Sequence, residues 1–144
     1  MGKGPRSKRI RPVHTDILVQ DFPIEAAVPR DIGASFVAAV VGERNALIEK
    51  IAAAVPEVDF SDPAWGTLNI PGCRLEIHLG QQHEVTSFSL HVDGGEIAHE
   101  VVQEILERLR LRGIDLESGR FIGRSSAKRR RRIGHHSRQL SLVR

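Results

Sequence analysis

The sequence predicts an α+β domain with an antiparallel sheet of four to five strands and two helices on one face of that sheet. Residues 65–92 contain three runs in which apolar and polar residues alternate, which is typical of half-buried strands. Two further segments space their apolar residues three and four apart, as amphipathic helices do. The length of 144 residues and the hydrophobic content of 40% suit a single domain with one core.

The N-terminal third is the part of the chain with the weakest pattern. Residues 1–11 are basic and have no apolar periodicity, so a disordered tail is expected. Residues 12–34 contain three prolines around a short apolar run at 17–19, which allows an edge strand there. Residues 35–41, SFVAAVV, have the composition of a buried strand, although Ala38 and Ala39 would also suit a helix.

Helical spacing begins at Glu43 and predicts the first helix, with Pro56 as its stop. Residues 56–64 are acidic and bounded by prolines, so a loop is expected between this helix and the three alternating runs. The apolar stripe of the helix consists of Leu47, Ile48, Ile51, Ala52 and Val55.

The three alternating runs predict a β-meander. Pro71-Gly72 separates the first two runs as a two-residue turn, which places Ile70 opposite Cys73. The third run is expected to place Phe88 opposite Ile77, because a slip of one residue would set an apolar row against a polar one. The covered face then carries Leu68, Ile70, Leu75, Ile77, Leu79, Phe88, Leu90 and Val92. The open face carries Trp65, Thr67, Asn69, Arg74, Glu76, His78, Ser87, Ser89 and His91.

A second helix follows the meander, with Asp93 as the expected N-cap and Glu96 in the reciprocal capping position. Gly113 is the expected left-handed stop. Residues 114–116 then predict a short closing strand, and residues 116–121 predict a turn. The apolar stripe of this helix consists of Ile97, Ala98, Val101, Val102, Ile105 and Leu109.

The order of strand, helix, three strands, helix and strand over residues 35–122 resembles the ferredoxin-like split βαβ arrangement with one extra strand. The likeness is one of element order. Because this architecture hosts many unrelated activities, it implies no particular function.

Charge is distributed very unevenly along the chain. Of the 21 basic residues, five lie in 1–11 and eight in 123–144, and neither segment contains an acidic residue. Residues 12–122 therefore hold eight basic residues against all 18 acidic ones, a net charge of −10. The predicted organisation is an acidic domain at 12–122 between two basic tails.

The single cysteine, Cys73, excludes an internal disulfide, and its place on the covered face predicts an inert, buried thiol. No run approaches the length of a membrane span. These features predict a soluble, cytoplasmic protein, with a nuclear location as the alternative in a nucleated cell.

Glu76, His78 and His91 are the weak candidates for a metal site on the open face. In the predicted register His78 lies opposite Ser87, which places it roughly 13 Å from His91 along the sheet. A register shifted by two residues would instead set His91 opposite Glu76. A solvated sheet face without metal or cofactor is the expectation. An enzyme, metal-dependent or not, that uses Glu76, His78 and His91 is the last alternative, because no catalytic motif supports it. Base stacking is not expected either, because Trp65 is the one aromatic ring on this face.

Two functions of different classes follow from these patterns. The leading one is a non-enzymatic interaction domain that presents an acidic surface to a protein partner or to a second copy of this chain. A membrane is not an expected partner. The candidate partner face consists of Trp65, Thr67, Asn69, Arg74, Glu76, His78, Ser89 and His91. The alternative is non-specific binding of nucleic acid phosphates by the basic ends. Its candidate residues are Lys8, Arg9, Lys128, Arg129, Arg130, Arg131 and Arg132.

Overall fold

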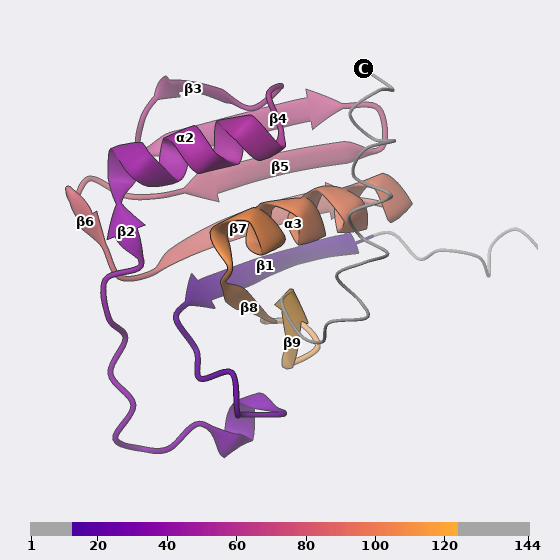
Figure 1. The fold of residues 1–144 in the computed structure, drawn as a ribbon. Helices are drawn as coiled ribbons and strands as arrows, with labels where there is room; N and C mark the ends of the chain where they lie inside the picture. The colour runs from indigo at the N-terminus through magenta and orange to yellow at the C-terminus, as the bar shows by residue number, and fades with distance from the viewer. Residues whose placement is uncertain (1–12, 124–144) are drawn as a thin grey trace, which may run out of the picture.

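The computed structural model describes residues 13–123, which form a seven-stranded antiparallel sheet, a two-stranded sheet and two α-helices (Figure 1). The large sheet contains β1 (Val13–Gln20), β3 (Asp59–Asp62), β4 (Trp65–Ile70), β5 (Cys73–His78), β7 (Phe88–Gly94), β8 (Arg112–Asp115) and β9 (Arg120–Gly123). The remaining elements are η1 (Pro29–Asp31), β2 (Gly42–Glu43), α2 (Arg44–Ala54), β6 (Glu84–Val85) and α3 (Glu96–Leu109).

The large sheet has the order β3-β4-β5-β7-β1-β8-β9, so β1 occupies an interior position between β7 and β8. The α+β class is confirmed. The sheet exceeds the four to five strands predicted, and the ferredoxin-like order is not confirmed. The prolines of residues 12–34 suggested an edge strand, but Pro12 and Pro23 flank β1 and leave its amides free to pair on both sides. Ile17 and Val19 are fully buried in this position.

The prediction of a buried strand at residues 35–41 is wrong. Because β1 already pairs with β7 and β8, this segment has no place in the sheet beside β1, and it runs as irregular chain with Val37 81% exposed. Its end is held by a bond from the Val41 amide to the Val85 carbonyl, next to the short pairing of β2 with β6.

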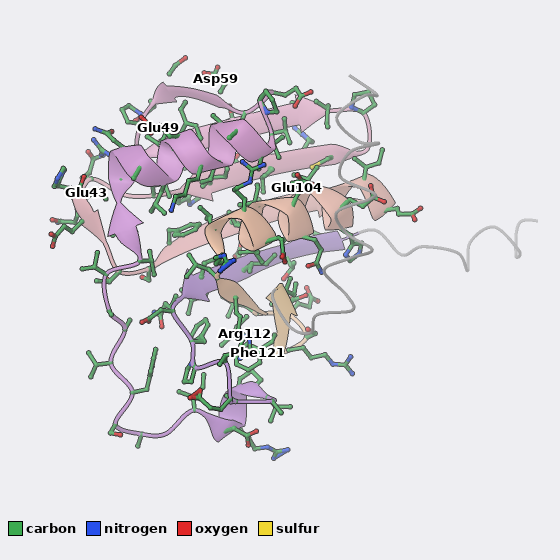
Figure 2. The ribbon with its side chains drawn as sticks, in the orientation of Figure 1. Glu43, Glu49, Asp59, Glu104, Arg112 and Phe121 are labelled. Carbon is green, nitrogen blue, oxygen red and sulfur yellow. The ribbon has the colours of Figure 1, made fainter. Side chains whose placement is uncertain are left out.

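An aromatic cluster holds the start of the 21–41 loop against the far end of the sheet. The Phe22 ring lies 6.0 Å from that of Phe36 and 5.8 Å from that of Phe121. The Arg112 guanidinium lies 3.7 Å above the Phe121 ring and donates to the Pro23 carbonyl at 2.6 Å. Figure 2 shows Arg112 and Phe121 together beside this loop. These contacts explain why a buried arginine is tolerated there.

The first hairpin of the meander is confirmed, with Ile70 opposite Cys73. The second pairing is shifted by two residues from the prediction, because Ile77 faces Leu90 rather than Phe88. Both registers keep the apolar residues on one face, so alternation does not distinguish them. The connection between β5 and β7 contains β6 and is longer than a tight turn, which allows β7 to slide further along β5.

The acidic loop predicted at residues 56–64 contains an edge strand, which is a further correction. β3 pairs with β4 through Asp59 opposite Thr67 and Asp62 opposite Trp65, with an irregularity between the two pairs. Phe60 packs over Gly66, where an added Cβ would lie 2.6 Å from the ring. The glycine therefore makes room for the aromatic side chain on the sheet.

Both helices lie on the same face of the large sheet and contact each other (Figure 1). α2 buries Leu47 and Ile51 of its predicted stripe and also Ala54, which the stripe did not include. α3 buries Ala98, Val101, Val102, Ile105, Leu106 and Leu109, so Leu106 is added to the predicted stripe and Ile97 is exposed. Neither helix within residues 13–123 combines the length and the hydrophobicity needed to cross a lipid bilayer.

The predicted ends of α3 are both corrected. Gly95 rather than Asp93 is the N-cap, because β7 extends to Gly94 and draws Asp93 into the sheet. At the other end Arg110 adopts the left-handed conformation, with φ 59°. Gly113 instead lies in β8, where an added Cβ would come within 2.5 Å of the Ile17 side chain. This glycine is needed for close strand packing and not for a helix stop.

Candidate functional site

The face of the sheet opposite the helices carries the candidate site. Burial alternates along β4 and β5, with Trp65, Thr67 and Asn69 exposed and the residues between them, Gly66 and Leu68, buried. The predicted division of the two faces is therefore confirmed. We call the open side the polar sheet face. Its residues are Trp65, Thr67, Asn69, Arg74, Glu76, His78, Ser89 and His91, together with His14, Asp16 and Asp93.

Two rows of charged groups cross three strands of this face. In one row Glu76 of β5 lies opposite His91 of β7, which lies opposite Asp16 of β1. Opposite partners on adjacent strands bring their side chains within contact distance. The imidazole of His91 is thus placed between two carboxylates.

The neighbouring row repeats the alternation with the signs exchanged. Arg74 of β5 lies opposite Asp93 of β7, which lies opposite His14 of β1. Asp93 is therefore placed between a guanidinium and an imidazole. Together the rows form a patch in which each carboxylate has a basic or protonatable neighbour across the strands.

Both histidines in these rows bond a carboxylate through Nδ1. The distance from His91 Nδ1 to Asp16 Oδ1 is 2.5 Å, and that from His14 Nδ1 to Asp93 Oδ1 is 2.9 Å. An ionised carboxylate can only accept, so each Nδ1 donates. The two rings meet edge to face with centroids 5.6 Å apart. These contacts join both rows into one network.

Asp93 also shifts the titration of its partner. Its hydrogen bond and its charge raise the pKa of His14 above the ordinary value against the opposing effect of burial, and Glu117 and Asp16 add smaller contributions. The hydrogen bond from His14 lowers the pKa of Asp93 in return, against a small opposing effect of burial. His14 therefore takes up a proton more readily than an isolated histidine.

Trp65 and His78 form a second group at the end of the same face. They lie opposite each other on β4 and β5, and their rings stack with centroids 4.0 Å apart. His78 Nε2 also lies 3.2 Å from Glu76 Oε1. Trp65 also pairs with Asp62 of β3, and it stays 44% exposed.

A depression of about 420 Å³, partly open to solvent, lies over β4, β5 and β7. Carboxylate, amide, hydroxyl, guanidinium and imidazole groups converge on it, so it can accept a polar side chain rather than an apolar one. Its lining residues are Thr67, Leu68, Asn69, Arg74, Leu75, Glu76, His91 and Asp93.

The observed register corrects the distance argument about a metal site. His91 lies opposite Glu76, and the residue opposite His78 is Ser89, only two residues from His91 along β7. The three candidates are therefore closer together than the predicted register placed them. Even so, among residues 13–123 no cluster of three or more histidine, cysteine, aspartate or glutamate side chains has the arrangement to hold a metal ion. Asp16 and Asp93 hold the Nδ1 atoms of His91 and His14 in internal hydrogen bonds.

Three residues of the face were missed from the sequence, namely His14, Asp16 and Asp93. The signal was present in the VHTDILV run, where His14 and Asp16 alternate with residues that are buried in the sheet. The candidates for binding polyanions, Lys8, Arg9 and Lys128 to Arg132, lie outside the described residues.

No protein-family model, curated protein or solved structure matches this chain. The features that define it are an α+β sheet with one face covered by helices and one face open, and a patch of paired histidines and carboxylates on the open side.

Proposed function

We propose that this protein is an interaction domain that binds a Lys/Arg-rich segment of a protein partner through the polar sheet face. The observation that carries the proposal is the position of Asp16, Glu76 and Asp93 on a sheet face that neither helix covers, where Glu76 and Asp93 line a partly open depression. Carboxylates in such a depression accept charge-assisted hydrogen bonds from guanidinium and ammonium groups.

The charge of the whole domain supports a cationic partner. Residues 12–122 carry 18 acidic and eight basic residues, so a basic segment is attracted before it makes contact. The basic ends of a second copy of this chain would meet the same requirement, so self-association is one form of the proposed interaction.

Trp65 supplies an apolar anchor beside the charged rows. It is 44% exposed and is stacked on His78, which holds its ring in place. Tryptophans are frequent anchors of protein interfaces, and arginine guanidinium groups stack well on their rings. The face thus offers both carboxylates and an aromatic surface to an arginine-containing segment.

The test is the affinity of the full chain for a capped Arg/Lys-rich peptide at neutral pH, measured by calorimetry. A variant with Asp16→Asn and Glu76→Gln is expected to bind at least about tenfold more weakly, because two acceptor charges are removed from the face. The matched control is Glu49→Gln with Glu104→Gln, which changes the net charge equally but on the helices (Figure 2). Equal weakening by both variants would reduce the proposal to a non-specific charge effect.

A second candidate function is association with nucleic acid through the basic ends. It is favoured by the charge segregation, since 13 of the 21 basic residues lie in 1–11 and 123–144. The full chain should retard a generic duplex in a gel at low salt. Replacing Arg129, Arg130, Arg131 and Arg132 together by glutamine should weaken that retardation several-fold, and an unchanged gel shift would exclude this role for the arginines.

A further inference from the structure

We infer that the polar sheet face is a proton-gated docking site, which binds its cationic partner while His14 and His91 are neutral and releases it when they are protonated. This inference rests on the proposed function and adds the condition under which the face is available. The relevant groups lie on β1, β5 and β7 and in the turn between β8 and β9.

Each of the two histidines is surrounded by the groups that a cationic ligand would use. His91 faces Glu76 on β5 and Asp16 on β1. His14 faces Asp93 on β7, and its ring also contacts that of His91. A proton on either imidazole therefore lies next to a carboxylate that would otherwise be available to a partner's lysine or arginine.

The other charged groups around the two histidines complete this environment. On β5, Arg74 lies in the same row as His14 and is the fixed positive charge of the face. From the turn between β8 and β9, Glu117 acts on His14 with its negative charge, as does Asp16 from within β1. These acids favour proton uptake by His14, whereas the charge of Arg74 lowers the pKa of Asp93.

Protonation of His14 and His91 cancels the negative formal charge of the polar sheet face. With neutral histidines, the three carboxylates of Asp16, Glu76 and Asp93 and the guanidinium of Arg74 give a charge of −2. Protonation of His14 and His91 changes this charge to zero. The face then no longer has a net charge that attracts a basic segment.

Protonation also engages the carboxylates internally. The Nδ1 to Oδ1 distances of 2.9 Å for His14 and Asp93 and 2.5 Å for His91 and Asp16 already have ion-pair geometry. A proton on the imidazole turns each of these hydrogen bonds into an ion pair between two charged groups, which a partner's cation must displace. Histidine ordinarily titrates near pH 6.5, whereas aspartate and glutamate stay ionised down to pH 5. The transition is therefore expected between pH 8 and pH 5.5.

The experiment measures the dissociation constant of the full chain for a rhodamine-labelled, capped Arg/Gly peptide at pH 8.0 and pH 5.5 by fluorescence anisotropy. The charge of this peptide is constant over that range. The ratio of the two dissociation constants within one protein is the readout, so a variant that binds more weakly at both pH values remains informative. The wild-type ratio is expected to be about tenfold or more.

Variants assign the effect to the two histidines. His14→Asn with His91→Gln keeps hydrogen-bonding side chains and should bring the ratio close to one. His99→Gln is the control, since His99 is exposed on α3 and should leave the ratio as in the wild type. Circular dichroism at both pH values verifies folding. His14→Asn alone is a milder variant, because His14 lies at a strand end with its side chain 73% exposed. It should give a smaller ratio of dissociation constants than the wild type.

Each outcome separates the two proposals. No binding at either pH would overturn the proposed function and the gate together. Binding with a wild-type ratio near one would overturn the gate and leave the proposed function standing. A large ratio that persists in the double variant would show that other groups control the release, which overturns the assignment to His14 and His91.

Discussion

His91 lies directly opposite Glu76 across the pairing of β7 with β5. This relationship follows from the two-residue shift of β7 and brings an imidazole against a carboxylate in the middle of the open sheet face. On the other side of β7, His91 lies opposite Asp16 of β1, and its Nδ1 lies 2.5 Å from Asp16 Oδ1. The surface charge of the sheet therefore depends on histidine protonation.

The titration of His14 tests the local electrostatics of this network. Because Asp93 raises the pKa of His14, the imidazole resonances of His14 should titrate above pH 6.5 in NMR spectra. Asp93→Asn should bring the midpoint back towards the ordinary value. A midpoint at or below 6.5 in the wild type would contradict the observed pairing.

The raised pKa of His14 also makes the stability of the fold depend on pH. A histidine whose pKa is raised by folding contributes stability in full below its unfolded pKa near 6.5, and this contribution disappears as the pH rises through the higher folded value. The loss of unfolding free energy caused by Asp93→Asn should therefore be larger at pH 6 than at pH 9. Urea denaturation at the two pH values measures it, and a loss that grows with pH would contradict the assignment.

Cys73 is predicted to be unreactive in the folded protein. It is 3% exposed, and burial raises the pKa of its thiol to about 11, so little thiolate exists at pH 8. A disulfide reagent should label it only after denaturation. Thr67→Cys in a Cys73→Ala background should react readily, because position 67 is exposed on the polar sheet face. Rapid labelling of the native wild type would show that the covered face is open.

Substitutions in the core should lower the free energy of unfolding far more than substitutions on the open face. Leu75 and Phe88 are 2% and 3% exposed beneath the helices, and replacing either by alanine is expected to cost about 2–5 kcal/mol of unfolding free energy. Thr67→Ala on the open face should cost less than about 1 kcal/mol. Chemical denaturation provides the comparison, and similar losses at both kinds of site would invalidate the assignment of faces.

Gly94 is predicted to tolerate no side chain. Its φ is +148°, and a Cβ there would lie 2.2 Å from the Gly72 carbonyl oxygen. Gly94→Ala must therefore distort the end of the β5–β7 pairing, with an expected loss of about 2 kcal/mol or more. At Gly95 an added Cβ meets no atom within 4 Å, so Gly95→Ala is the control and should cost less. Equal stability of the two variants would contradict the geometry of this turn.

The sequence predicted the elements whose pattern is local. The alternation of β4 and β5 and the two-residue turn gave the first hairpin correctly, and the apolar spacing gave both helices to within a few residues. In contrast, the place of β1 and the register of β7 depend on pairings between distant segments. Both registers of β7 satisfy the alternation, and the difference lies in the long connection that contains β6.

The candidate face was predicted only in part for the same reason. Glu76, His78 and His91 were recognised as facing one side, because each lies in a strand with clear alternation. Their partners His14 and Asp16 belong to a strand that appeared to be an edge, so the network of histidines and carboxylates became visible only when β1 was placed beside β7.

The measurement that tests the proposed function most directly is an NMR titration of the isotope-labelled full chain with the Arg/Lys-rich peptide at pH 8. The largest amide shift changes are predicted at Thr67, Asn69 and Glu76 on the polar sheet face, with the Trp65 indole signal shifting in parallel. Changes confined to α2 and α3 around Glu49 and Glu104, or no changes at a large excess of peptide, would contradict the proposal that this face binds the partner.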